Sequence, residues 1–148
     1  MRSSLCAGLL VGLVLALPGP LLAQSNEQAV SAATEAAQEW LALFDAEKYE
    51  ATWSAASSFF QSKIGKEQWV MRIEQTKKRQ PVLDSLRSRS RVAARYTTSL
   101  PNAPDGEYVV VQYRATYAEE EFIETMTLTK DGDDWRVAGY FTKPPRQQ

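Results

Sequence analysis

The 148-residue sequence contains no histidine. Without imidazole, the chain cannot activate a serine or cysteine nucleophile through a neighbouring histidine, and it cannot bind a metal through histidine nitrogen. Any catalysis would depend on carboxylates, tyrosine, lysine or arginine. The sequence therefore favours a protein that binds over one that catalyses, and it predicts no cofactor.

Cysteine is almost as scarce, because Cys6 is the only one and lies in the apolar run "LCAGLLVGLVLAL". Arg2 before this run and "LPGPLLAQS" after it give the pattern of a signal peptide over residues 1–23, with cleavage expected near Ala23. The run is shorter than the ~20 residues that span a bilayer, and an uncleaved anchor is the alternative. We expect a periplasmic or secreted mature protein without thiols.

The remaining residues predict one domain over residues 24–143, followed by a disordered tail at residues 144–148. Apolar residues recur at helical spacing after a capping box formed by Ser25 and Gln28, again as one helix within residues 44–60, and a third time after Gly65. Pro81 is expected to end the third helix. Helices therefore occupy the first half of the domain.

From Ser85 onward the apolar pattern changes to a period of two, which predicts four antiparallel strands within residues 85–100, 108–117, 122–129 and 135–143. Helices followed by such strands indicate an α+β fold in which the helices cover one face of a curved four-stranded antiparallel sheet. This order of elements resembles the nuclear-transport-factor-2-like cone, in which curvature leaves a cavity between the two layers.

Glu124 interrupts an otherwise apolar row in the third strand, between Phe122 and Met126. If the row faces the helices, Glu124 is buried and must meet a cation or have a raised pKa. One interpretation is a general base, or an acid that grips a ligand, at the floor of a cavity. The other is a structural pair with Arg114 or Arg136 on a neighbouring strand.

Aromatic residues are the second candidate feature, since they dominate small-molecule sites as well as cores. The predicted ligand-binding set joins aromatic residues to the buried acid: Trp40, Trp53, Tyr113, Glu124 and Tyr140. The alternative is that the aromatic members are only core. In an isomerase or lyase of cone-shaped fold, Tyr113 or Tyr140 would donate to a developing oxyanion while Glu124 acts as the base.

Basic residues cluster between residues 72 and 95, where eight of them face only two acidic ones. Strict alternation places Arg87, Arg89, Arg91 and Arg95 on one face of the first strand, opposite Val92. We predict Arg87, Arg89 and Arg91 as a weak contact surface for anionic headgroups or a protein partner, and a solvated edge is the alternative. Nucleic acid is not expected, because no RNA-binding motif is present. The short acidic turns fit hairpins, and no metal site is predicted.

Five segments together carry a resemblance: "EWLALFDAEKYEATWSAAS", "QWVMRIEQTKKRQPVLDSLRSR", "LPNAPDGEYVVVQY", "ETMTL" and "WRVAGYF". The chain from about Thr34 to Lys143 resembles the bacterial domain of unknown function 4019 family. The segment "RQPVLDS" departs from the family, whose members usually carry a glycine there. The resemblance implies small exported bacterial proteins with helices before a sheet, and it implies no activity.

The sequence thus predicts an exported, non-enzymatic module of the cell envelope that binds a small molecule, peptide or protein. An isomerase or lyase with Glu124 as base is the alternative, and a structural protein that uses the arginines on anionic surfaces is a third hypothesis. Contact with a membrane is expected only through an uncleaved leader or through weak attraction to anionic surfaces.

Overall fold

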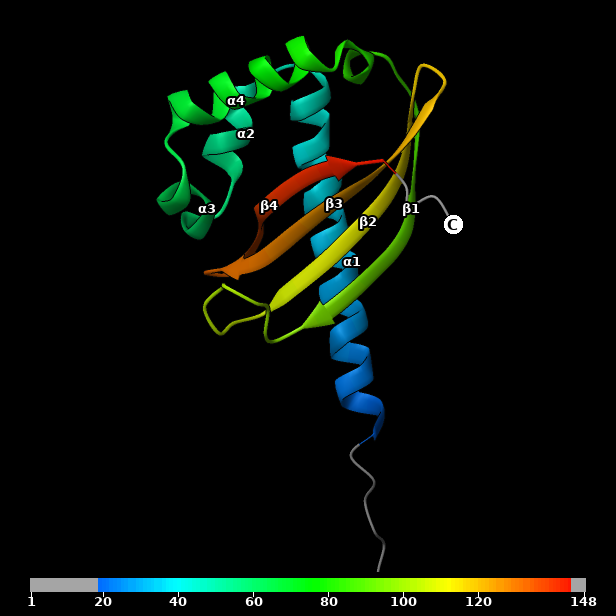
Figure 1. The fold of residues 1–148 in the computed structure, drawn as a ribbon. Coiled ribbons are helices and arrows are strands. Elements are labelled where there is room, and N and C mark those ends of the chain that lie inside the picture. The colour runs from blue at the N-terminus through cyan, green and yellow to red at the C-terminus, as the bar shows by residue number, and fades with distance from the viewer. Residues whose placement is uncertain (1–18, 145–148) are drawn as a thin grey trace, which may run out of the picture.

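The computed structural model describes residues 19–144, in which helices pack against one face of a curved, open, four-stranded antiparallel sheet (Figure 1). The predicted α+β class is confirmed. The strand order is that of the chain, β1-β2-β3-β4. Most of the predicted leader, residues 1–18, and most of the predicted tail, residues 145–148, lie outside the described residues. None of the described helices is long and apolar enough to cross a membrane.

Helix α1 (Gly19–Asp45) begins upstream of the predicted capping box at Ser25, so that predicted start is wrong. Pro20 suits the new start, since a missing N–H costs nothing in the first helical turn. The N-terminal part of α1 extends beyond the sheet (Figure 1). Further along, Ala33 and Ala37 have no exposed surface. Their small side chains let α1 lie close to the sheet, where it packs on all four strands.

The single helix predicted within residues 44–60 is wrong, because it is divided into α2 (Tyr49–Ala55) and α3 (Ser58–Lys63). Ser57 causes the break. Its Oγ accepts a hydrogen bond from the Phe60 N–H at 3.2 Å, and its own N–H donates to the Val137 carbonyl at 2.9 Å. A residue whose N–H is bound by a strand cannot continue the preceding helix, but it can cap the next one.

Helix α4 (Lys66–Arg79) ends before Pro81 as predicted, and a short 3₁₀ turn, η1 (Pro81–Asp84), leads to the sheet. Buried Thr52 on α2 connects α4 to α1. Trp40 Nε1 donates to the Thr52 carbonyl, and Trp69 Nε1 donates to Thr52 Oγ1, each at 2.9 Å. Three helices therefore meet at one threonine.

The strands are β1 (Leu86–Thr97), β2 (Tyr108–Tyr117), β3 (Glu120–Asp131) and β4 (Asp134–Lys143). The predicted inward row of β3 is confirmed, because Phe122, Glu124, Met126 and Leu128 are all buried. Val109 and Val111 of β2 are fully buried in the same core. The core therefore lies between this face of the sheet and the helices.

The predicted faces of β1 are wrong because the strand is not regular. Its pairing with β2 shifts between Leu86 and Ser88, and again between Arg91 and Ala93. Each bulge adds a residue and reverses which side chains face the core. As a result, Arg89 is directed to the helices, whereas Val92 is 47% exposed.

Candidate functional site

Glu124 lies in the interior, at the helix-facing side of β3, and none of its surface is exposed. Its Oε2 accepts a hydrogen bond from Arg89 Nε at 2.5 Å, and its Oε1 accepts one from Arg89 Nη2 at 3.0 Å. Oε1 also accepts hydrogen bonds from the hydroxyls of Tyr117 and Tyr140, the latter at 3.1 Å. Four donors thus surround the carboxylate.

Arg89 binds a second carboxylate at the C-terminal end of α1. Its Nη1 and Nη2 donate to the two oxygens of Asp45 at 2.6 and 3.0 Å, in the bidentate geometry that suits guanidinium. Burial disfavours the charge, but the hydrogen bonds to Asp45 and Glu124 outweigh this effect and raise the pKa of Arg89 above its ordinary value. Arg89 therefore joins β1 to β3 and to α1.

The predicted partners of Glu124 are wrong. Arg114 lies near Glu121 at 3.8 Å, and Arg136 lies near Asp134 at 3.3 Å. The true partner comes from β1, which is not adjacent to β3. Arg89 pairs in register with Ala115 of β2, and the small methyl group of Ala115 leaves room for the guanidinium to reach over β2.

The two phenols that donate to Glu124 hold their protons firmly. Burial first, and then the charge and hydrogen bond of Glu124, raise the pKa of Tyr117 above its ordinary value. Burial and the charge of Glu124 also raise the pKa of Tyr140. Because each phenol has a single proton, both protons are committed to the carboxylate at neutral pH.

This arrangement does not fit a general base. A base needs an oxygen that can reach a substrate proton. Both oxygens of Glu124 accept hydrogen bonds, and neither is exposed. Tyr140 does not fit an oxyanion donor, since its proton already points to Glu124. The residues do fit a rigid polar cluster that fixes the surrounding side chains.

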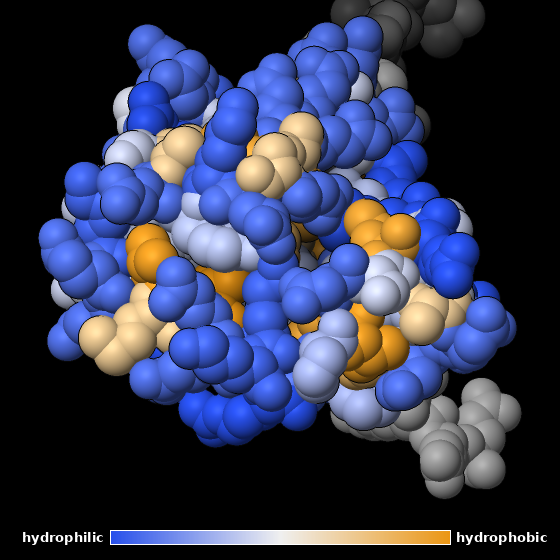
Figure 2. Space-filling model, turned by 90° about the horizontal axis from the view of Figure 1, so that it is seen from above, coloured by the Kyte–Doolittle hydropathy of each residue, from blue (hydrophilic) through white to orange (hydrophobic). Residues whose placement is uncertain are grey.

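A pocket of about 270 Å³ lies beside this cluster, between α4, the end of α1, η1 and β4. Its walls are mainly apolar or aromatic, and both phenols of the cluster belong to them. The lining residues are Phe44, Trp69, Arg72, Ile73, Thr76, Lys77, Leu83, Tyr117, Tyr140, Phe141 and Thr142. Figure 2 looks onto this end of the molecule and shows hydrophobic surface between hydrophilic residues.

Ring stacking fixes one wall of this pocket. The Phe44 ring lies 4.9 Å from that of Tyr140 and 5.4 Å from that of Trp40, and the Trp40 ring lies 6.1 Å from that of Trp69. These separations are those of favourable aromatic pairs. The wall is therefore formed before any ligand arrives.

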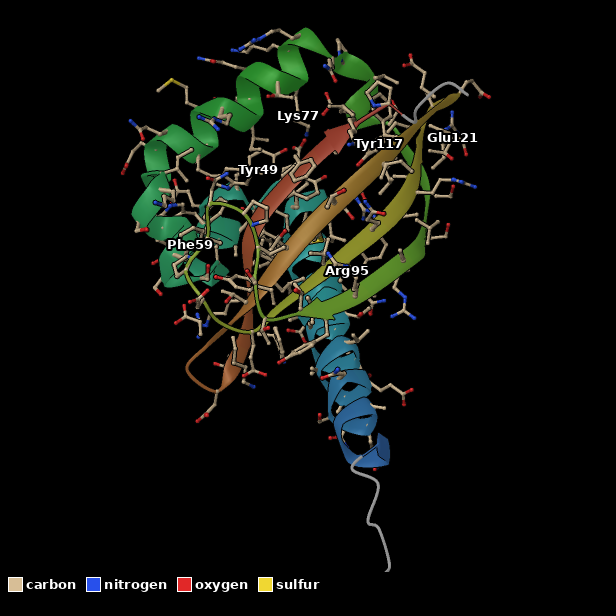
Figure 3. The ribbon with its side chains drawn as sticks, turned by 60° about the horizontal axis from the view of Figure 1, so that its bottom comes forward. Tyr49, Phe59, Lys77, Arg95, Tyr117 and Glu121 are labelled. Carbon is tan, nitrogen blue, oxygen red and sulfur yellow. The ribbon has the colours of Figure 1, made fainter. Side chains whose placement is uncertain are left out.

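Lys77 on α4 also lines the pocket, and it connects α4 to α2 and η1 (Figure 3). Its Nζ donates to Tyr49 Oη and Glu47 Oε1, both at 2.6 Å, and lies 2.7 Å from Asp84 Oδ1. Burial alone would lower the pKa of Lys77, but the hydrogen bonds to Asp84, Glu47 and Tyr49 raise it. Its charge is thus neutralised within the protein.

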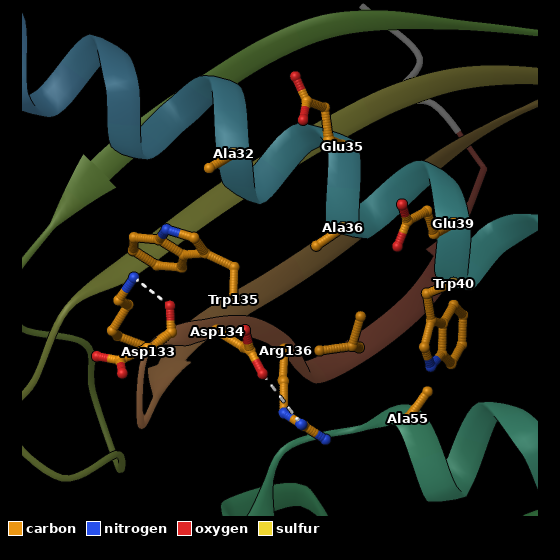
Figure 4. Close-up of a pocket in the computed structure, with 12 residues that line it drawn as sticks. Ala32, Glu35, Ala36, Glu39, Trp40, Ala55, Asp133, Asp134, Trp135 and Arg136 are labelled. Carbon is orange, nitrogen blue, oxygen red and sulfur yellow. Dashed lines mark hydrogen bonds and ion pairs between the residues drawn. The ribbon is translucent and has the colours of Figure 1, made fainter.

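A wider cleft of about 550 Å³ lies at the other end of β4, between α1 and the β3–β4 hairpin (Figure 4). Glu35, Glu39 and Trp135 line it, and so does Trp40, which is only 2% exposed. Among the described residues, no group of three or more histidine, cysteine, aspartate or glutamate side chains could hold a metal. This cleft offers open charged surface rather than an enclosed site.

The other predicted ligand-binding residues do not line the smaller pocket. Trp53 Nε1 donates to the Ile64 carbonyl at 2.8 Å, outside both cavities. Tyr113 is 3% exposed, and within residues 19–144 its hydroxyl is the buried side-chain polar atom without a hydrogen-bond partner. Tyr113 nevertheless lies opposite Glu124 in the pairing of β2 with β3. The Trp40 ring lies 5.2 Å from that of Tyr140, which donates to Glu124. The structure thus brings Trp40, Tyr113, Glu124 and Tyr140 of the predicted set close together, but only Tyr140 of these lines the smaller pocket.

The predicted arginine surface is wrong for Arg89, whose side chain is 12% exposed and paired. Arg91 is exposed but donates to Thr34 Oγ1 on α1 at 3.2 Å, and Arg87 is exposed. Sequence reasoning also missed Tyr117 and Arg72. Tyr117 could have been predicted from its inward position in the period-two pattern of the second strand. For Arg72 the sequence offered only its location in the basic segment.

The family model described as Protein of unknown function (DUF4019) matches residues 36–140. These residues include the end of α1, all the other helices and nearly the whole sheet, and therefore the Arg89–Glu124 cluster and the core of the pocket. A search of curated proteins finds no significant match, and neither does a search of solved structures. The chain belongs to the family of proteins of unknown function DUF4019.

Proposed function

We propose that this protein is an exported, non-enzymatic domain that binds a small, mainly apolar molecule in the pocket between α4 and β4. The observation that carries the proposal is the pairing of an apolar pocket with a fixed wall. Phe44 and Tyr140 are held by ring contacts, and Tyr140 is also held by Glu124. A preformed wall lowers the entropy cost of binding.

The volume limits the size of the ligand. Pockets for drug-sized molecules measure about 300–1,000 Å³. At about 270 Å³, this pocket suits a molecule of one ring or a short branched chain. Apolar contact with Trp69, Ile73 and Leu83 would supply most of the binding free energy.

Binding without chemistry is supported by the state of the buried acid. Glu124 is the buried carboxylate next to the pocket wall, and the hydrogen bonds that it accepts from Arg89, Tyr117 and Tyr140 leave it structural. The absence of histidine from the whole chain points the same way. Export to the periplasm or the medium is supported by the signal-peptide pattern of residues 1–23 alone.

Indole, a neutral apolar probe, tests the proposal with a variant that fills the pocket. Thr76→Trp places a large ring into the pocket from α4, whereas Gln75→Trp, on the same helix, does not face it. We expect indole to bind the parent protein and the Gln75→Trp control, and to lose most of its affinity for Thr76→Trp. Calorimetric titration would measure this, with the melting temperature as the check on folding.

The same pair of variants can be purified after export and examined by native mass spectrometry. Small molecules retained by the parent and by Gln75→Trp should be missing from Thr76→Trp. Equal binding of indole by all three proteins would show that the pocket is not the binding site.

A further inference from the structure

We propose that the ligand of this pocket is a small acid whose apolar body carries a hydrogen-bond donor at the end remote from the acid group. This inference rests on the proposed function and specifies its ligand class. It depends on the direction of the hydrogen bonds around Glu124 and on the charges at the edge of the pocket.

The hydrogen-bond direction makes Tyr140 an acceptor. Its single hydroxyl proton is donated to Glu124 Oε1 at 3.1 Å. The lone pairs of the Tyr140 oxygen can then only accept a hydrogen bond. Among the described residues, no donor is bonded to this oxygen. Tyr117 is less available, because Arg89 Nη2 approaches its oxygen at 3.5 Å. A ligand hydroxyl or N–H can therefore satisfy Tyr140, whereas a ligand ether or carbonyl would place two acceptors face to face.

The charge at the edge of the pocket comes from Arg72. Two cations line the pocket, but Lys77 is already paired with Glu47 and Asp84. Arg72 forms no ion pair with any of the described residues, and its side chain is exposed. An anionic group on the ligand would therefore meet an uncompensated guanidinium, with which a carboxylate can form two hydrogen bonds.

The body between the two polar ends is expected to be a ring. Phe44, Trp69 and Tyr140 each present an aromatic surface to the pocket. Aromatic pairs gain about 0.5–1.5 kcal/mol beyond the area that they bury. A hydroxylated aromatic acid with one ring fits the volume of the pocket, can donate a hydrogen bond to Tyr140 and can pair its negative charge with Arg72.

Matched probes test the donor. 4-Hydroxyphenylacetate can donate to Tyr140, phenylacetate has no polar group at that position, and 4-methoxyphenylacetate can only accept. We expect 4-hydroxyphenylacetate to bind the full-length protein about tenfold more tightly than 4-methoxyphenylacetate, which is the usual magnitude of one hydrogen bond. Calorimetry or ligand-observed NMR titration would measure the three dissociation constants.

Variants assign the preference to residues. Tyr140→Phe should abolish the difference between the hydroxy and methoxy probes while leaving phenylacetate affinity within about twofold. Arg72→Gln should weaken all three acids alike and leave neutral 4-methylphenol unaffected. Arg79→Gln, at the end of the same helix and outside the pocket lining, is the matched control and should change nothing.

The results separate this inference from the proposed function. If indole and 4-methylphenol bind but the methoxy and hydroxy acids bind equally, the ligand class is wrong and the pocket remains a binding site. If the preference persists in Tyr140→Phe, the acceptor is another group and the inference fails. If none of these probes binds, the proposed function fails, and the inference fails with it.

Discussion

Arg89 connects two carboxylates that differ in their access to water. The side chain of Glu124 is 0% exposed, whereas that of Asp45 is 35% exposed. Loss of the guanidinium would leave Asp45 free to become hydrated. Glu124 would remain a buried charge with only the phenols of Tyr117 and Tyr140 as partners.

Arg89→Ala should therefore destabilise the protein by about 3–5 kcal/mol, the usual cost of removing one member of a buried ion pair. Arg87→Ala, two positions earlier on the same strand and exposed, should stay within about 0.5 kcal/mol of the parent. Denaturant unfolding of the two variants measures both values. A loss below about 1 kcal/mol for Arg89→Ala would show that Glu124 does not depend on this guanidinium.

The inward position of Glu124 could be predicted from its neighbours, because alternation in β3 continues without interruption. Its partner could not be predicted. A cation on the next strand was the natural expectation, yet Arg89 reaches over β2 because Ala115 is small. The contact between Arg89 and Glu124 depends on three residues from three strands, and the residue pattern of a single strand cannot predict it.

At the scale of elements, Thr52 determines how the helices meet. It has no exposed surface, it accepts from Trp40 through its carbonyl, and it accepts from Trp69 through its hydroxyl. The hydroxyl in turn donates to the Tyr49 carbonyl at 2.7 Å. One side chain therefore satisfies a buried indole of α4 and anchors it to α2.

Thr52→Val keeps the shape and removes the hydroxyl. Trp69 Nε1 would be left buried without an acceptor, and the expected loss is about 1–3 kcal/mol in the free energy of unfolding. The matched test is the same change in a Trp69→Phe background, where there is no indole N–H to leave unpaired. The loss should be smaller there. Equal losses in both backgrounds would show that the bond to Trp69 contributes no stability.

The order and type of most elements could be predicted from the sequence, because β2 and β3 alternate over most of their length and α1 and α4 carry apolar residues at helical spacing. Three features could not. The division between α2 and α3 depends on a hydrogen bond from Ser57 to a strand far along the chain. The bulges of β1 depend on pairing with β2, and the irregularity of β4 at Ala138 depends on pairing with β3. All three result from tertiary contacts.

At the scale of the whole molecule, the protonated groups around the pocket predict sensitivity to alkaline pH. The raised pKa values of Tyr117, Tyr140 and Lys77 mean that the folded protein keeps protons that the unfolded chain loses above about pH 10. A raised pKa gives stability that is complete below the unfolded value. That stability declines as the pH rises toward the folded value.

The free energy of unfolding should therefore be nearly constant between pH 7 and 9 and should fall above about pH 10. Each retained proton contributes a slope of about 1.4 kcal/mol per pH unit. Tyr117→Phe removes one such proton, so it should lower stability at pH 7 and yet make the alkaline decline less steep by about that amount. Denaturant titrations at several pH values, with tyrosinate absorbance recorded in parallel, would measure both effects.

If Tyr117→Phe left the alkaline slope unchanged, or if tyrosinate formed fully before unfolding, the phenols would not be held protonated by the buried carboxylate. The acceptor geometry at Tyr140, which rests on the same polar cluster, would then need to be rejected with it.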